Sequence, residues 1–255
     1  PAVNTSRRKI HEEIELLAKN LLKNLQSCDL ILLPERWAPF KKDMVANFQE
    51  ERGVDYRFAK ELASQYGISL ISGAIWEKRG GQEKPRITSY YFNEQGDEIG
   101  RQDKIHLYAY EKKFFQEGSK LKLFRIDDTI FAILICFDMA FYETPRLAAE
   151  NGADVFFSPT QIRQDGMENW KIYLKARVLE NRVPAVACNT LGNFFNRTFL
   201  GNSQIISFEN GFMSPSKLKI VEAPLGESGY ACGHVDVIFP RKMRKVRLAE
   251  KVDKT

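Results

Sequence analysis

At 255 residues and 44% hydrophobic composition, the chain can bury a large core, and we expect a single domain over residues 1–255. Its 38 basic and 33 acidic residues leave a net charge of +5 that is spread along the chain, which argues against a dedicated nucleic-acid binder. No apolar run approaches the roughly 20 residues of a membrane helix, and no signal-peptide segment opens the chain, so we expect a cytoplasmic protein without a membrane partner.

Helical and strand patterns alternate in the first part of the chain. Apolar residues at helical spacing predict helices, and short apolar runs between them predict buried strands. In chain order we expect a helix at 10–25, a strand at 30–33, a helix at 58–66, a strand at 68–75 and a hairpin with strands at 88–93 and 98–101.

Residues 103–120 have no clean periodicity but combine aromatic and charged side chains, which is typical of a long, ordered loop over a site. The basic run 241–247 is interpreted as a solvated tail rather than a phosphate-binding or membrane-binding patch. Between them we expect a hairpin at 124–126 and 130–135, a helix at 144–151, a strand at 155–158, a helix at 170–182, and strands at 185–188, 203–208, 218–221 and 232–237. We find no linker or internal repeat.

Of the four cysteines, Cys136 has the setting of a nucleophile. It stands where an apolar strand gives way to a polar stretch, at the carboxyl end where open α/β sheets place their sites. Cys28, Cys188 and Cys232 precede, lie in or lie beside apolar strands and are interpreted as small inert hydrophobes. No close cysteine pair indicates a metal site or a redox dithiol, so no metal is expected, and free thiols favour the cytosol.

A thiol needs a partner that removes its proton or stabilises its thiolate. None of His11, His106 and His234 is compelling, although His106 lies in the irregular loop two residues after Lys104. A carboxylate whose pKa is raised by burial can serve instead, and Glu35 directly follows a buried strand. From these residues alone, a structural ion pair is an equally good interpretation of Glu35.

Three short segments stand out by their order along the chain: Pro34-Glu35, Lys104-Ile105-His106-Leu107 and Ile135-Cys136-Phe137-Asp138. Together they resemble the signature segments of the nitrilase superfamily of carbon–nitrogen hydrolases, in order and in spacing. The run 111–118 is similar to the family segment whose glutamate forms a fourth member of the site, and Glu111 matches that glutamate. Nearly the whole chain is covered, because Glu143 and residues 176–182, 189–192 and 201–203 also fit.

The resemblance implies a four-layer α-β-β-α sandwich of the α/β (α+β) class that forms a homodimer or higher homo-oligomer and needs no metal or organic cofactor. It implies that Cys136 attacks the substrate while Glu35 takes its proton, and that water hydrolyses the resulting thioester. Lys104 and the Phe137 backbone N–H would hold the oxyanion, and Glu111 would orient the substrate amide and Lys104.

Two departures from the family pattern bear on the fold and on the pocket. The family has a strand ahead of its first helix, which residues 1–6 cannot supply, so we expect the usual first strand to be missing and its neighbours to be exposed. Met139 and Ala140 stand where many amidase-type members carry an arginine after the aspartate of the cysteine segment. We interpret this as a subgroup difference.

Substrate contacts are expected from the loops around Cys136. Arg163 is a candidate for a substrate carboxylate, as in an ω-amide or an N-carbamoyl amino acid, although a surface arginine is the commoner case. We therefore predict a hydrolase that cleaves a non-peptide carbon–nitrogen bond of a small linear amide or N-carbamoyl amine. The expected substrate-binding residues are Phe137, Tyr110, Met139, Ala140, Thr160 and Arg163, with 160–167 and 194–199 as further candidates.

Two alternatives remain open at this point. A nitrilase acting on nitriles would use the same four residues, so the sequence does not separate it from an amidase. A binding or scaffold protein that kept the fold without turnover is the alternative from another class, and the intact set of four residues argues against it. Taken singly, each of the four is an ordinary ion-pairing residue or core thiol; their joint order favours a site.

Overall fold

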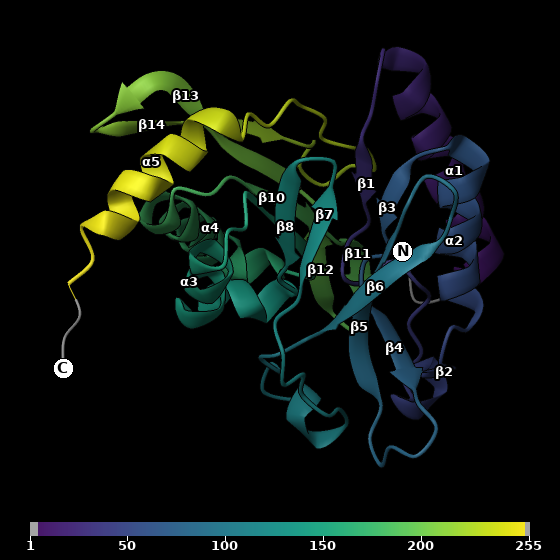
Figure 1. Cartoon of the computed structure of the whole chain (residues 1–255). Coiled ribbons are helices and arrows are strands. Elements are labelled where there is room, and N and C mark those ends of the chain that lie inside the picture. Colours follow the sequence, from purple (N-terminus) through teal and green to yellow (C-terminus); the bar gives the residue numbers. More distant parts are fainter. Residues whose placement is uncertain (1–4, 253–255) are drawn as a thin grey trace.

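The computed structural model describes residues 5–252 as two β-sheets that face each other, with helices on both outer sides (Figure 1). The N-terminal part of the chain builds one sheet and the C-terminal part builds the other. Helices α1 (Arg7–Asn24) and α2 (Val54–Tyr66) cover the first sheet. Helices α3 (Glu143–Glu150), α4 (Met167–Asn181) and α5 (Ile238–Ala249) cover the second. This is the predicted four-layer α-β-β-α arrangement.

The first sheet delivers two candidate site residues at the ends of its strands. Its order is β1-β3-β5-β4-β2, and β6 pairs with β5. The pairs β1/β3 and β2/β4 are parallel, and the β5 pairs are antiparallel. The strands are β1 (Leu30–Leu32), β2 (Gln49–Glu50), β3 (Ser69–Ile71), β4 (Ile75–Lys78), β5 (Arg86–Phe92) and β6 (Glu98–Asp103).

The second sheet has the order β14-β13-β10-β9-β8-β7, and its central strands β8, β9 and β10 are parallel. A separate two-stranded hairpin, β11 and β12, follows β10. The strands are β7 (Leu123–Ile126), β8 (Thr129–Ile133), β9 (Val155–Thr160), β10 (Ala185–Asn189), β11 (Leu191–Phe194), β12 (Arg197–Leu200), β13 (Gln204–Met213) and β14 (Ser216–Glu222). None of the helices in residues 5–252 is both long and apolar enough to cross a membrane.

Three apolar layers hold the four structural layers together. The layer between the sheets packs Trp76 and Ile87 of the first sheet with Phe131 and Ile133 of the second, and Cys136 belongs to it. Each fully buried large apolar side chain stabilises such a layer by about 1.5–3 kcal/mol relative to an exposed one. The nucleophile candidate therefore sits at the edge of the core between the sheets.

The predicted strand 68–75 is two strands, because the chain turns at Gly73. This residue has φ +71°, and a Cβ added there would lie 2.1 Å from the Pro34 carbonyl oxygen. The break between β3 and β4 also exposes the Ser72 carbonyl, which accepts the Trp37 indole N–H at 2.8 Å. A glycine is therefore required where the β3–β4 connection passes under the segment that carries Glu35.

Two C-terminal expectations were wrong. Residues 232–237 form no strand; Val235 and Val237 do pack against the layer between the sheets, but no described strand edge pairs with this segment. The basic run 241–247 is no solvated tail, because it belongs to α5. There Arg241 and Arg244 bond both oxygens of the buried Asp154 at 2.7–2.8 Å.

The expectation about a missing first strand falls partly on residues 1–4, which lie outside the described residues. The next residues lead directly into α1, where the Ser6 hydroxyl accepts the Lys9 N–H as an N-cap. Strand β1 is hydrogen-bonded to β3, and no strand within residues 5–252 pairs with its other edge.

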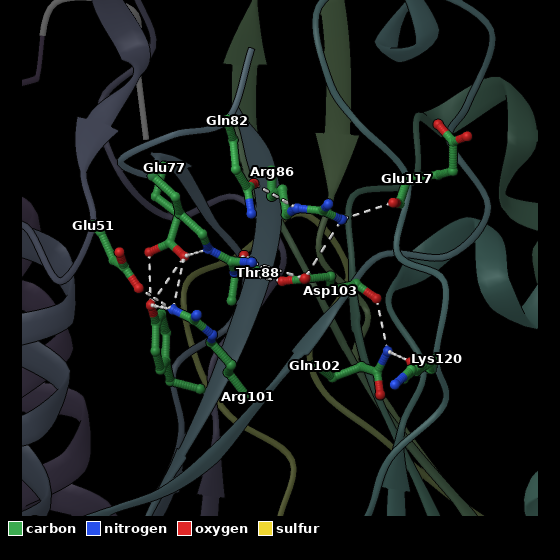
Figure 2. Close-up of polar contacts among 12 residues, drawn as sticks. Glu51, Glu77, Gln82, Arg86, Thr88, Arg101, Gln102, Asp103, Glu117 and Lys120 are labelled. Atoms are coloured by element: carbon green, nitrogen blue, oxygen red, sulfur yellow. Dashed lines mark hydrogen bonds and ion pairs between the residues drawn. The ribbon is translucent and has the colours of Figure 1, made fainter. Parts of the chain in front are cut away.

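A buried ion network fixes strands β4, β5 and β6 to one another (Figure 2). Arg79 donates to Glu77 at 2.8 Å, to Thr88 at 2.7 Å and to both oxygens of Asp103. Arg86 extends the network to the Glu117 carbonyl at 2.7 Å. Because Asp103 immediately precedes Lys104, the network holds the strand end that delivers this lysine.

Candidate active site

The four predicted catalytic residues meet at one place. Glu35 follows β1, Lys104 follows β6, Cys136 follows β8 after a two-residue extension, and Glu111 opens a short 3-10 helix, Glu111–Lys113. The Lys104 ammonium lies 2.7 Å from the Glu35 carboxylate and 2.9 Å from that of Glu111. All four side chains are buried. The structure thus assembles residues that lie up to 101 positions apart, Glu35 and Cys136 being the extremes.

The charges of this cluster keep Lys104 protonated. Burial alone would lower the pKa of Lys104, but Glu111, Glu35 and Cys136 outweigh it and raise that pKa well above its ordinary value. Burial raises the pKa of Glu111, as does the Glu35 carboxylate, against the opposing effect of Lys104. Two carboxylates thus share one ammonium in a site with little access to water.

The backbone presents Cys136 in a strained conformation. Its φ is +47°, in the left-handed region that side-chain-bearing residues rarely adopt, and it begins the 3-10 helix Cys136–Ala140. Burial raises the pKa of the Cys136 thiol well above its ordinary value, and the Glu35 carboxylate raises it further, against the opposing charge of Lys104. The resting thiol is therefore protonated at neutral pH.

Asp138 ties the lysine segment to the cysteine turn. Its fully buried carboxylate accepts the backbone N–H groups of Ile135 at 3.0 Å, Ile105 at 3.1 Å and His106 at 2.6 Å. The His106 Nδ1 lies 3.1 Å from the same carboxylate. Asp138 therefore sets the position of Lys104 relative to Cys136, a role that the sequence analysis did not assign. The signal was an acidic residue two positions after the candidate nucleophile, where an apolar strand ends.

A hydroxyl and a carbonyl from the second sheet hold the segment that carries Glu35. The Thr160 carbonyl accepts the Glu35 N–H at 3.2 Å and the Thr190 N–H at 3.1 Å. The Thr190 hydroxyl accepts the Arg36 N–H at 3.2 Å and lies 2.9 Å from the Arg36 carbonyl. These bonds connect the two sheets, so both sheets determine the position of Glu35.

Arg177 of α4 fixes the far end of the cysteine turn. Its Nε donates to the Met139 carbonyl at 3.1 Å, and its Nη2 donates to the Ala140 carbonyl at 3.2 Å. A partner for these carbonyls was not identified in the sequence analysis. Through these two bonds, the backbone carbonyls of Met139 and Ala140 connect the cysteine turn to α4.

Three of the predicted substrate contacts have other surroundings than expected. Met139 is fully buried in the apolar layer beneath α3 and α4, on the far side of the sheet from Cys136. Thr160 is also fully buried, and its hydroxyl bonds Cys188 O and Asn189 Oδ1 rather than facing the site. Arg163 pairs with Asp165 at 2.9 Å on an open surface depression of about 680 Å³. Pattern alone does not say which way these side chains turn.

Phe137 and Tyr110 lie next to candidate catalytic residues. Phe137 is partly exposed beside Cys136, with its ring edge-to-face against Tyr108 at 5.2 Å. Tyr110 directly precedes Glu111, and burial followed by the Glu111 charge raises the pKa of its hydroxyl. The thiols of the other cysteines have different surroundings: Cys28 donates to the Leu30 carbonyl at 3.7 Å, Cys188 lies 3.7 Å from the Ser203 hydroxyl, and Cys232 is exposed.

Comparison with known proteins agrees with this geometry. The sequence model of the carbon–nitrogen hydrolase family matches residues 1–215, and the chain belongs to this family. A probable nitrilase of Schizosaccharomyces pombe is 34% identical over 155 residues; the match covers 60% of this chain and 57% of that protein. A 2-oxoglutaramate amidase of Bacillus subtilis is 29% identical over 190 residues, or 72% of each chain.

Solved structures show the same fold. The crystal structure of Saccharomyces cerevisiae Nit3, a member of branch 10 of the nitrilase superfamily, superposes with a TM-score of 0.83 at 23% identity over 97% of this chain and 91% of that one. A carbon–nitrogen hydrolase from Helicobacter pylori gives a TM-score of 0.80 at 19% identity, covering 96% and 90%. The fold is thus that of the nitrilase superfamily.

Proposed function

We propose that the protein hydrolyses the carbon–nitrogen bond of a small linear amide or N-carbamoyl amine through a thioester on Cys136. The observation that carries this proposal is the buried cluster in which the Lys104 ammonium lies 2.7 Å from the Glu35 carboxylate and 2.9 Å from that of Glu111, with the Cys136 thiol buried in the same site. The arrangement places a nucleophile, a base and a fixed positive charge together without bulk water.

In the first half-reaction, Glu35 takes the Cys136 proton as the sulfur bonds the substrate carbonyl carbon. The oxyanion that forms is stabilised by the Lys104 ammonium and the Phe137 N–H, which as a first-turn donor has no acceptor within its own 3-10 helix. When the carbon–nitrogen bond breaks, Glu35 returns the proton to the departing nitrogen, which leaves a neutral amine or ammonia and a thioester.

In the second half-reaction, the same carboxylate activates water. Glu35 removes a proton from the water as it attacks the thioester carbonyl, and the proton then passes to the departing sulfur. Glu111 stays bonded to Lys104 throughout, which keeps the ammonium aimed at the oxyanion position. The name of the Bacillus subtilis relative, a 2-oxoglutaramate amidase, supports an amide as substrate, whereas the Schizosaccharomyces pombe relative is named a probable nitrilase.

Intact-protein mass spectrometry combined with ammonia release tests this proposal. Wild-type protein incubated with a panel of amides, N-carbamoyl amines and nitriles is expected to release ammonia from an amide or carbamoyl compound and to show a single acyl adduct after rapid acid quench. Cys136→Ala is expected to show neither, and the matched control Cys188→Ala to show both. Ammonia from nitriles alone, or turnover that survives in Cys136→Ala, would refute the proposal.

A further inference from the structure

The side chain of Arg36, next to the proposed base Glu35, is a buried cation with no ion-pair partner among the described residues. It is only 3% exposed, and its Nε is enclosed with no hydrogen-bond acceptor. Its guanidinium makes no hydrogen bond or ion pair with any residue of the described chain. It lies instead over the faces of Trp76, at 3.8 Å, and Phe40, at 4.5 Å.

The other buried arginines of residues 5–252 show how unusual this is. Arg79 bonds Glu77 and Asp103, Arg177 bonds Glu180, and Arg244 bonds Asp154. Each of them therefore has a carboxylate. A buried charge without an ion-pair partner is destabilising, and stacking on aromatic rings offsets only part of that cost. An anion that entered the site would supply the missing partner.

The surroundings of Arg36 place its guanidinium close to the candidate active site. Trp76 and Cys136 belong to the same apolar cluster, and Phe40 packs against it. Tyr110, Glu35 and Arg36 are close enough to influence one another's charge. Burial lowers the pKa of Arg36 to about 10, which still leaves the guanidinium charged at neutral pH. Its backbone is clamped on both sides by Thr190, so the cation is held beside the base.

We propose that Arg36 is the subsite for a substrate carboxylate, so that the enzyme acts on short anionic amides such as the monoamide of a small dicarboxylic acid or an N-carbamoyl amino acid. This inference rests on the proposed function and narrows its substrate class. It also moves the carboxylate contact from the exposed Arg163 to a residue that adjoins Glu35. A planar guanidinium fits a carboxylate through two parallel N–H bonds, and the flanking aromatic faces fix its plane.

Paired substrates test the subsite. Succinamate and glutaramate carry a carboxylate where the neutral amides butanamide and pentanamide carry a methyl group. In the wild type we expect kcat/KM to favour the anionic member of each pair by about 100-fold, as for a charge-assisted bidentate contact. In Arg36→Met this preference is expected to fall to within about tenfold of unity, mainly through KM, and Arg36→Lys should lie between them.

The matched control is Arg163→Met, which removes an exposed arginine already paired with Asp165 and is expected to keep the wild-type preference. A wild-type preference near unity, or the same preference in folded Arg36→Met as in wild type, would overturn the subsite. If Arg36→Met does not fold, Arg36→Lys can be tested instead, in a Cys136→Ala background. Succinate is then expected to raise the Tm of the Arg36→Lys, Cys136→Ala protein less than that of Cys136→Ala alone. An equal rise would overturn the subsite.

Failure of the proposed function has a different signature. If wild type hydrolyses neither member of any pair and forms no acyl adduct, the hydrolase proposal fails. The rise in Tm with succinate would then still report on Arg36 alone.

Discussion

The Cys136 thiol holds its proton at rest because burial and the Glu35 carboxylate both raise its pKa. Glu35→Gln removes the charge but keeps the shape of the side chain. We expect the Cys136 thiol to titrate at a lower pH in this variant, followed as thiolate absorbance near 240 nm. Turnover should nevertheless fall by about 10²–10⁴, because the base is lost. An unchanged or higher thiol pKa in Glu35→Gln would contradict the assigned contact.

Asp138 is expected to act as a positioning residue. Asp138→Asn retains a single acceptor oxygen for the N–H groups of Ile105, His106 and Ile135, so Lys104 should shift relative to Cys136. We expect kcat to fall by about 10–100-fold with a smaller change in KM. The control Asp165→Asn alters an exposed carboxylate outside the site and should leave both constants as in wild type. A change confined to KM would argue for direct substrate binding instead.

The candidate catalytic side chains could be named from the sequence, but the residues that orient them could not. Glu35, Lys104, Glu111 and Cys136 follow from the order of family-like segments. Whether Met139 turns into the pocket or into the core depends on the path of the turn after Cys136, which packing decides. The unpaired state of Arg36 is likewise visible only once its surroundings are known.

At the scale of elements, Gly73 links the first sheet to the position of Glu35. Gly73→Ala adds a Cβ that would meet the Pro34 carbonyl at 2.1 Å, in a backbone already at φ +71°. We expect it to lower the free energy of unfolding by about 3 kcal/mol and to reduce kcat as the Glu35 segment is displaced. Urea unfolding and steady-state kinetics measure the two effects.

Gly81→Ala is the matched control for that substitution. Its φ of +74° is almost the same, but an added Cβ would have open space around it. It should lower the free energy of unfolding by only about 1 kcal/mol and leave kcat unaffected. Equal effects of the two substitutions would show that backbone conformation, not contact with the Pro34 carbonyl, is responsible.

Elements with strong periodicity were predicted from sequence, as α1, α4 and the hairpins β5/β6 and β7/β8 show. The misses have physical causes. The run 68–75 is apolar throughout, so pattern alone cannot place its break. Residues 232–237 alternate like a strand but have no paired edge, and pairing is a property of the fold. Helix α5 was not predicted, because two of its basic side chains, Arg241 and Arg244, pair with Asp154 and the sequence does not show this.

At the scale of the whole molecule, Asp154 fastens α5 to the second sheet. Burial alone would raise the pKa of Asp154, but Arg241 and Arg244 outweigh it and lower that pKa. A carboxyl with a lowered folded-state pKa stabilises above its unfolded-state pKa, and this stability is lost as the pH falls through the folded-state value. Asp154→Asn should therefore lower the free energy of unfolding at pH 7 by about 3 kcal/mol. The difference from wild type should shrink below pH 3.8, the ordinary pKa of the group, in urea titrations.

We also propose that the chain forms a homodimer through the outer faces of α3 and α4. These neighbouring helices leave Leu147, Ile172 and Tyr173 exposed at 49%, 64% and 40%. Large apolar side chains exposed on two neighbouring helices support an interface there. Light scattering is expected to give twice the chain mass for wild type and a monomer for Ile172→Glu, whereas a monomeric wild type would refute the proposal.

Glu35 and Lys104 come from one sheet and Cys136 from the other, and the bonds that align them, through Thr160, Thr190 and Asp138, run across the gap between the sheets. The proposed activity therefore depends on the alignment of the two sheets. A displacement of about 1 Å between the two sheets, each of them still folded, is enough to reduce the rate of such a site by about 100-fold. Under gentle heating or low denaturant, inactivation should precede any loss of secondary structure, and it should reverse on cooling or dilution.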